Sequence, residues 1–173
     1  FDNQKSLKNN TDDLENIDGI SYIKEKKFIQ NKKQKIIDNL DILTPYDYNI
    51  FDKQSLIRPY NGKVLKAVDF EMSRGCIYSC NYCVETIIQK YYNFTDSSAK
   101  TGAIKNFKSY LRNKSAKTIF DELYFLNKVK NIELIRCQDT NFLTNERNVL
   151  YELSDLIDKS DLDIKIYIET RPE

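Results

Sequence analysis

The chain has 173 residues, which is the length of one domain or of one domain with a lead-in segment. Its 27 Lys and Arg residues are balanced by 26 Asp and Glu residues, so no overall positive field exists to hold nucleic acid. The absence of histidine excludes a Ser-His-Asp triad, a Cys-His pair and a His-ligated metal site in this sequence. No apolar run approaches the ~20 residues of a membrane-spanning helix, so no membrane association is expected.

The chain begins at Phe1 and its only methionine is Met72, so we interpret it as a piece of a longer protein. Residues 1–18 are polar and are predicted to form a linker or a frayed end. Residues 19–63 are predicted to form a β-hairpin around a charged KEKK turn, followed by a connecting segment over 36–61.

From residue 64 to residue 173 the sequence alternates between strand and helix patterns. Expected strands cover 64–72, 132–137 and 164–169, and expected helices cover 84–92, 115–129 with Ser115 as its cap, and a segment capped by Thr144 or Asn145. Strands separated by helices predict an α/β fold with a parallel sheet or barrel. Three strands cannot close on themselves, so residues 64–173 are predicted to form a partial (β/α) barrel. The first and third strands have one apolar and one polar face, which predicts either a ligand-holding lumen or exposed edge strands.

Three of the four cysteines lie within eight residues, at Cys76, Cys80 and Cys83. A disulfide framework would spread its cysteines, so this spacing indicates a metal or cluster in a reducing compartment, and a cytoplasmic location is expected. The C-x3-C-x2-C spacing suits three corners of one cuboidal iron–sulfur cluster, with one iron left open for chemistry. Gly75 would let the backbone turn tightly beside the cluster. The alternative is a structural zinc site, for which Cys137 would have to be the fourth ligand rather than a small buried hydrophobe.

The segment Ser73–Cys83, which reads SRGCIYSCNYC, resembles the cysteine loop of the radical S-adenosylmethionine (SAM) superfamily. The resemblance implies that Cys76, Cys80 and Cys83 ligate a [4Fe–4S] cluster whose open iron binds the amino and carboxylate groups of SAM. It further implies reductive cleavage of SAM to methionine and a 5′-deoxyadenosyl radical, with Tyr82 near the adenine. The electron would come from an external donor of the flavodoxin or ferredoxin type.

The lead-in segments 19–31 and 37–48 are similar to a subclass in which a cobalamin-binding domain precedes the barrel. Residues 110–115, the Phe120–Leu123 helix and the segment Gln138–Phe142 are also similar to that subclass. The resemblance implies cobalamin held outside this chain, because its D-x-H-x-x-G motif needs a histidine. Two features depart from the family pattern. The hairpin turn lacks its usual glycine, and a Gly-Gly-Glu element is replaced by Gln138-Asp139-Thr140. Asp139 is the candidate to receive the SAM amino group, or else it is a capping or turn residue.

Other polar residues have two interpretations each. Glu169 and Tyr167 either point into the lumen toward ribose or substrate, or lie outside the site. Asp69 and Glu71 are either lumen carboxylates or partners of Lys and Arg side chains. Arg74 either supports the cluster electrostatically or forms a surface salt bridge. The lysines between residues 24 and 35 are predicted to form a solvated face.

These features together predict a radical SAM enzyme that abstracts a hydrogen atom from an unactivated C–H position. The substrate would be an unidentified small molecule or peptide, and use of cobalamin would make methylation of that carbon the outcome. Two alternatives stay open at this point. One is a tRNA methylthiotransferase-like radical SAM enzyme, and the other is a non-catalytic zinc- or iron–sulfur-binding module.

Overall fold

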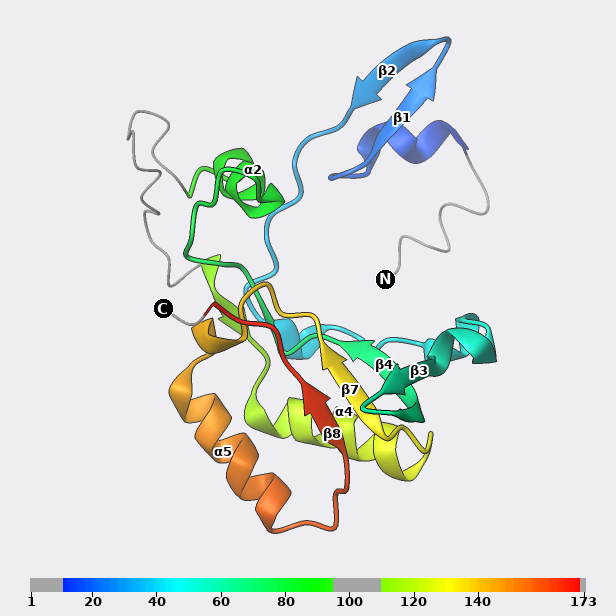
Figure 1. The fold of residues 1–173 in the computed structure, drawn as a ribbon. Coiled ribbons are helices and arrows are strands. Elements are labelled where there is room, and N and C mark those ends of the chain that lie inside the picture. The colour runs from blue at the N-terminus through cyan, green and yellow to red at the C-terminus, as the bar shows by residue number, and fades with distance from the viewer. Residues whose placement is uncertain (1–10, 95–109, 172–173) are drawn as a thin grey trace. The chain divides into compact units, whose positions relative to one another are not determined.

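The computed structural model describes residues 11–94 and 110–171, and Figure 1 shows the fold. The chain divides into two compact units, Phe1–Ile37 and Asp38–Glu173, which are described separately. Residues 1–10 of the predicted linker lie outside the described residues. Within the described ranges, no helix combines the length and apolar character that crossing a bilayer requires.

The first unit contains a 3₁₀ helix, Thr11–Asn16, and the predicted β-hairpin. Strands β1 (Ser21–Lys24) and β2 (Lys27–Gln30) pair antiparallel. The turn residues Glu25 and Lys26 have φ of 51° and 66°, the left-handed conformation that a two-residue hairpin turn requires. The hairpin therefore forms without a glycine, at a cost of about 1–2 kcal/mol for each turn residue. The lysines of the hairpin and of the segment just after it are exposed, as predicted.

The second unit contains a four-stranded sheet with the order β3-β4-β7-β8. Strands β3 (Ile57–Tyr60) and β4 (Lys63–Phe70) form an antiparallel hairpin. Its turn residues, Asn61 and Gly62, have φ of 48° and 74°, as expected for an Asn-Gly turn. The segment over 36–61 is therefore more than a connection, because it contains the whole of the edge strand β3.

Strands β4, β7 (Leu134–Cys137) and β8 (Lys165–Tyr167) are parallel. Helix α4 (Ala116–Lys128) lies in the connection from β4 to β7, and α5 (Arg147–Asp158) lies in the connection from β7 to β8. This order confirms the predicted mixed α/β fold. The predicted strand over 64–72 ends earlier in the structure, because the chain leaves β4 after Phe70.

The two helices begin in different ways. At α4, Ser115 Oγ accepts a hydrogen bond from the Thr118 N–H at 3.2 Å, which confirms Ser115 as the N-cap. At α5 the predicted cap is wrong, because the helix begins after Glu146, whose side chain makes no capping bond. Neither Thr144 nor Asn145 caps this helix. Asn145 is instead buried, and its side-chain amide donates a hydrogen bond to the Asp139 carboxylate at 2.8 Å.

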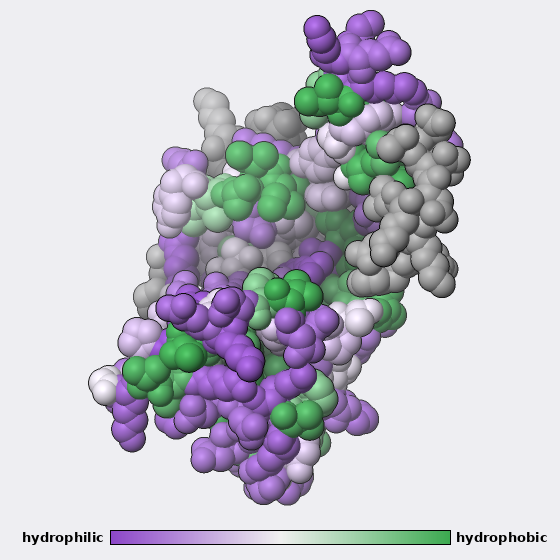
Figure 2. All heavy atoms as spheres, turned by 90° about the vertical axis from the view of Figure 1, so that its right-hand side faces the viewer, coloured by the Kyte–Doolittle hydropathy of each residue, from purple (hydrophilic) through white to green (hydrophobic). Residues whose placement is uncertain are grey.

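Helices α4 and α5 pack against one face of the sheet, where the main core lies (Figure 1). Burying one large aliphatic or aromatic side chain stabilises the fold by about 1.5–3 kcal/mol. The buried side chains of this core include Val68, Phe70, Ile119, Leu123, Leu126, Ile135 and Leu153. Cys137 belongs to the same core and is 1% exposed, which confirms it as a small buried hydrophobe. On the molecular surface shown in Figure 2, apolar side chains lie in small groups among polar ones.

The opposite face of the parallel strands is polar where the strands end. Asp69 of β4 and Arg136 of β7 are in register, and their side chains form an ion pair at 3.5 Å. Tyr167 of β8 is in register with Arg136 and is 40% exposed. A cavity of about 480 Å³ lies beside this face, and its lining includes Asp69, Glu71 and Arg136. The strand ends have the polar character expected of a lumen, whereas Leu65, Ala67 and Leu134 make the same face apolar further back along the strands. Binding of a ligand there stays a prediction.

Candidate functional site

The cysteine loop joins β5 (Ser73–Arg74), which follows the first parallel strand β4, to α2 (Val84–Tyr91). Cys83 occupies the N-cap position of α2, and its N–H donates to the Cys80 carbonyl at 3.0 Å. Thr86 Oγ1 donates to the same carbonyl at 3.0 Å. Cys80 and Cys83 are therefore held within one turn at the start of the helix.

Gly75 turns the chain at the point where the loop begins. Strand β5 pairs antiparallel with β6 (Arg112–Asn113), so the backbone of Tyr110 lies against the loop. Gly75 has φ of +99°, and a Cβ at this position would clash with the Tyr110 carbonyl oxygen. The predicted tight turn is present, and the close neighbour that requires glycine is this segment of the chain.

Gly75→Ala should destabilise the protein more than a glycine substitution that only strains φ. Gly62→Ala is the matched control, because Gly62 has φ of +74° and nothing within 4 Å of its missing Cβ. We expect about 1–2 kcal/mol for Gly62→Ala and about 1–3 kcal/mol more for Gly75→Ala from the clash. Urea unfolding of both variants measures the difference. Equal losses would mean that the contact with Tyr110 is not tight.

The three cysteine side chains differ in burial. Cys76 is 7% exposed, whereas Cys80 and Cys83 are partly exposed, and all three are free thiols. Burial raises the pKa of the Cys76 thiol, the Tyr78 N–H at 3.5 Å opposes the shift, and Glu85, Cys83 and Cys80 raise the pKa further.

The donor set fits an iron–sulfur cluster. Among the described residues, no group of three or more His, Cys, Asp and Glu is placed to hold a single metal ion. A cuboidal cluster makes a different demand, because its thiolate ligands bind different iron atoms. Three soft thiols at this spacing, one of them buried and two beside a helix start, match that demand.

Gln89 holds the loop from the side of α2. Its side chain is fully buried, and its Nε2 donates to the carbonyls of Cys76 at 2.7 Å and Tyr78 at 3.1 Å. It is the only buried residue of α2, a helix that the structure describes completely. These bonds fix the backbone of the loop between the first cysteine and the second.

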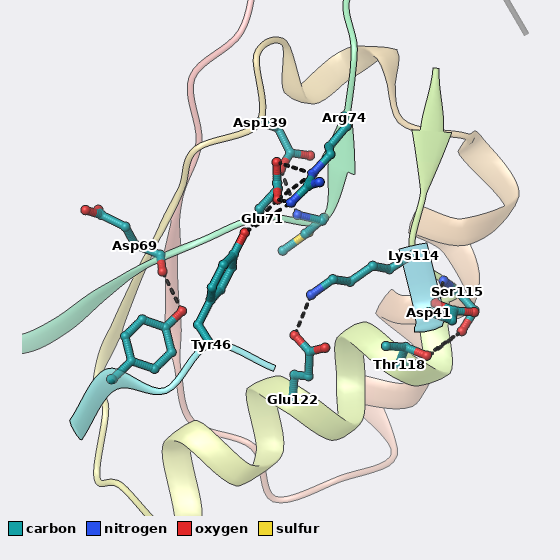
Figure 3. A network of polar contacts seen from close by, with 12 residues as sticks. Asp41, Tyr46, Asp69, Glu71, Arg74, Lys114, Ser115, Thr118, Glu122 and Asp139 are labelled. Atoms are coloured by element: carbon teal, nitrogen blue, oxygen red, sulfur yellow. Dashed lines mark hydrogen bonds and ion pairs between the residues drawn. The ribbon is translucent and has the colours of Figure 1, made fainter. Parts of the chain in front are cut away.

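Asp139 fixes the entrance to the loop (Figure 3). Its carboxylate is 4% exposed and accepts hydrogen bonds from the Met72 N–H at 2.8 Å and from Ser73 Oγ at 2.6 Å. Asn145 Nδ2 is the third donor, at 2.8 Å. All three donors belong to this chain, which favours the prediction that Asp139 is a capping or turn residue. A contact between Asp139 and the SAM amino group stays a prediction.

Glu71 and Arg74 form a pair beside the same entrance (Figure 3). Arg74 Nε lies 3.0 Å from both Glu71 carboxylate oxygens, and Nη2 lies 2.9 Å from one of them. The hydrogen bonds to Glu71 raise the pKa of Arg74. Tyr46 also donates to Glu71 at 2.8 Å. A salt bridge is one of the two roles predicted for Arg74, and it is present. The same bridge gives Glu71 the arginine partner that is one of its two predicted roles.

The other predicted cofactor residues lie at the surface. Tyr82 is 92% exposed, so its ring is free of packing on either side. Glu169 follows β8 and is exposed, and its carbonyl accepts a hydrogen bond from the Phe142 N–H at 3.1 Å. Contacts of Tyr82 and Glu169 with SAM stay predictions.

Comparison with known proteins finds similarity both by sequence and by structure. No family model matches the chain. The chain is 24% identical over 164 residues to the anaerobic magnesium-protoporphyrin IX monomethyl ester cyclase of Synechocystis sp., and the match covers 95% of this chain and 28% of the cyclase. Among solved structures it matches the cobalamin-dependent S-adenosylmethionine radical enzyme OxsB in its apo form, with a TM-score of 0.57 and 22% identity. The TM-score is 0.52, with 19% identity, for OxsB with aqua-cobalamin and S-adenosylmethionine bound. Both matches cover 95% of this chain and 20% of OxsB.

The chain is similar to OxsB, a cobalamin-dependent radical SAM enzyme. The similarity agrees with the resemblance that the cysteine loop and the lead-in predict. The OxsB matches establish a shared fold, and the chain spans only 28% of the cyclase and 20% of OxsB.

Within this radical SAM-like fold, two contributors to the loop could not be found from the sequence. Gln89 has the ordinary spacing of a polar residue on an amphipathic helix, and only the structure shows it buried against the loop. Arg171, just beyond β8, reaches the loop from 91 residues away, with Nη1 3.4 Å from Cys80 Sγ. No local pattern links residues at that separation.

Proposed function

We propose that this chain is the part of a radical SAM enzyme that binds the cluster and SAM. One observation carries the proposal. Cys76, Cys80 and Cys83 lie in the loop that follows β4 and the short strand β5, and the backbone of this loop is fixed by Gly75 and Gln89. Similarity to the cyclase and to OxsB supports it.

In this proposal the three cysteines hold a [4Fe–4S] cluster and leave one iron without a protein ligand. When bound, such a cluster supplies the electron that breaks the sulfonium C–S bond of SAM, which gives methionine and a 5′-deoxyadenosyl radical able to abstract hydrogen from an unactivated C–H position. A flavodoxin- or ferredoxin-type protein would be the electron donor. Free thiols suit a reducing compartment such as the cytoplasm.

Three further residues receive proposed roles. The exposed ring of Tyr82 would lie against the adenine of SAM, because an aromatic face without packing can stack on a base. Glu169 would face the ribose or the substrate from the end of β8. For Asp139 we propose the positioning role, because its carboxylate is already filled by donors from the loop entrance and from Asn145.

The wider architecture is also a proposal. Strands β4, β7 and β8 would be the first three strands of a partial (β/α) barrel, with their polar face toward the lumen. Because OxsB is a cobalamin-dependent enzyme, we propose that this chain acts with cobalamin held outside its own residues. The outcome would then be methylation of an unactivated carbon in a small-molecule or peptide substrate.

Anaerobic reconstitution with iron and sulfide tests this function. The protein is used with any sequence that flanks the chain in its native form. We expect about four irons and four sulfides per chain, and a change in the electron paramagnetic resonance (EPR) spectrum of the reduced cluster when SAM is added. Stoichiometric zinc without iron would contradict the proposed cluster. An EPR spectrum that does not change when SAM is added would contradict the proposed catalysis.

A further inference from the structure

Arg171 makes two contacts with the cysteine loop from the far end of the chain. Its Nη1 donates to Cys80 Sγ at 3.4 Å, and its guanidinium lies over the ring of Tyr78, 4.5 Å from the ring centre. The side chain is partly buried. A guanidinium stacked on an aromatic ring keeps its edge free to donate, so the two contacts are compatible with each other.

The backbone around Arg171 is fixed by a buried asparagine. Asn141, which is 4% exposed and follows β7, accepts at Oδ1 from Thr170 Oγ1 at 2.7 Å and from the Arg171 N–H at 3.4 Å. Thr170 Oγ1 also accepts from the Leu143 N–H at 3.3 Å. The segment after β8 is thus clamped to the segment after β7, and the position of Arg171 is set by the sheet.

Two other cationic side chains near the loop entrance pair with carboxylates. Arg74 is bound by Glu71 through contacts of 2.9–3.0 Å. Lys114 is bound by Glu122 at 2.6 Å. Arg171 directs a charged donor at a cysteine sulfur.

We propose that Arg171 tunes the reduction potential of the cluster by donating a charge-assisted hydrogen bond to the Cys80 thiolate. The inference rests on the proposed function, since it requires Cys80 to be a cluster ligand. Reduction adds one electron from an external one-electron donor and forms or breaks no bond. A cation and a hydrogen bond at a ligating sulfur stabilise the more negative, reduced cluster, so they raise its potential.

Three substitutions separate the charge from the hydrogen bond. Arg171→Met removes both, Arg171→Lys keeps the charge, and Arg171→Gln keeps a neutral donor. In EPR-monitored redox titrations with dithionite and without SAM, we expect Arg171→Met to lower the ratio of reduced to oxidised cluster about tenfold at a fixed potential, a fall of ~59 mV. Arg171→Lys and Arg171→Gln should give smaller falls. Lys159→Met is the control, because Lys159 is exposed at the end of α5, pairs with Asp155 and should leave the potential unchanged.

The outcomes distinguish this inference from the proposed function. A normal iron content with an unchanged potential in Arg171→Met overturns the role of Arg171 and leaves the cluster assignment standing. An unchanged potential with weaker SAM binding also overturns it and assigns Arg171 to SAM. If Arg171→Met takes up little iron, the potentials of Arg171→Lys and Arg171→Gln test the inference in its place. Wild-type potentials in both of these variants overturn it. A wild-type protein that binds no iron overturns the proposed function instead.

Discussion

Glu122→Leu should lower the free energy of unfolding by about 3–5 kcal/mol, because it leaves a buried ammonium without its counter-charge. Lys114 Nζ lies 2.6 Å from Glu122 Oε2, and the two side chains are 5% and 9% exposed (Figure 3). The ammonium also lies 4.8 Å from the centre of the Phe70 ring, inside the second unit. Urea unfolding of the wild type and the variant measures the loss.

Two controls identify the cause. The double variant Lys114→Met with Glu122→Leu removes both charges and should recover most of the stability, as apolar replacements of buried pairs do. Asp121→Leu breaks the exposed pair with Lys117 on the same helix, whose side chains are 56% and 76% exposed, and should cost at most about 1 kcal/mol. A double variant as unstable as Glu122→Leu would show that the loss comes from packing and not from charge.

Cys80→Ala should abolish stable cluster binding, because three cysteines are the complete protein ligand set in the proposed site. We expect at least a tenfold fall in iron and sulfide retained after anaerobic reconstitution and gel filtration. The visible absorption of the cluster should be lost in parallel. Iron analysis of the purified protein measures the effect directly.

Cys137→Ala is the matched control for that experiment. Cys137 is 1% exposed in the core, and burial raises the pKa of its thiol to about 12, so it stays protonated at neutral pH. The variant should retain its iron. Equal loss of iron from both variants would contradict the ligand set and would return Cys137 to consideration as a fourth ligand.

Much of the fold could be predicted because the relevant signals are local. Val68 and Phe70 alternate with Asp69 along β4, and this spacing alone places the core on one side of the strand. Ser115 precedes an apolar periodicity, which marks the start of α4. The cysteine spacing is likewise local, so the candidate ligands could be named from the sequence.

The remaining features depend on contacts between distant segments, which no local pattern records. Asp139 and Asn145 read as turn or cap residues, yet Asp139 binds the loop entrance about 66 residues earlier. Lys114 and Glu122 read as ordinary surface charges, and only tertiary packing buries them. The strand β3 was hidden for a different reason, since Pro59 argues against a strand except at a sheet edge.

That edge strand determines how the sheet could grow. β3 is the outermost strand on its side, and Pro59 has no backbone N–H to offer a further neighbour. Arg58 and Lys63 add charge to the same hairpin, which also discourages intermolecular strand pairing and aggregation. Any additional strand, whether from the same polypeptide or from another copy, is therefore directed to the opposite border at β8.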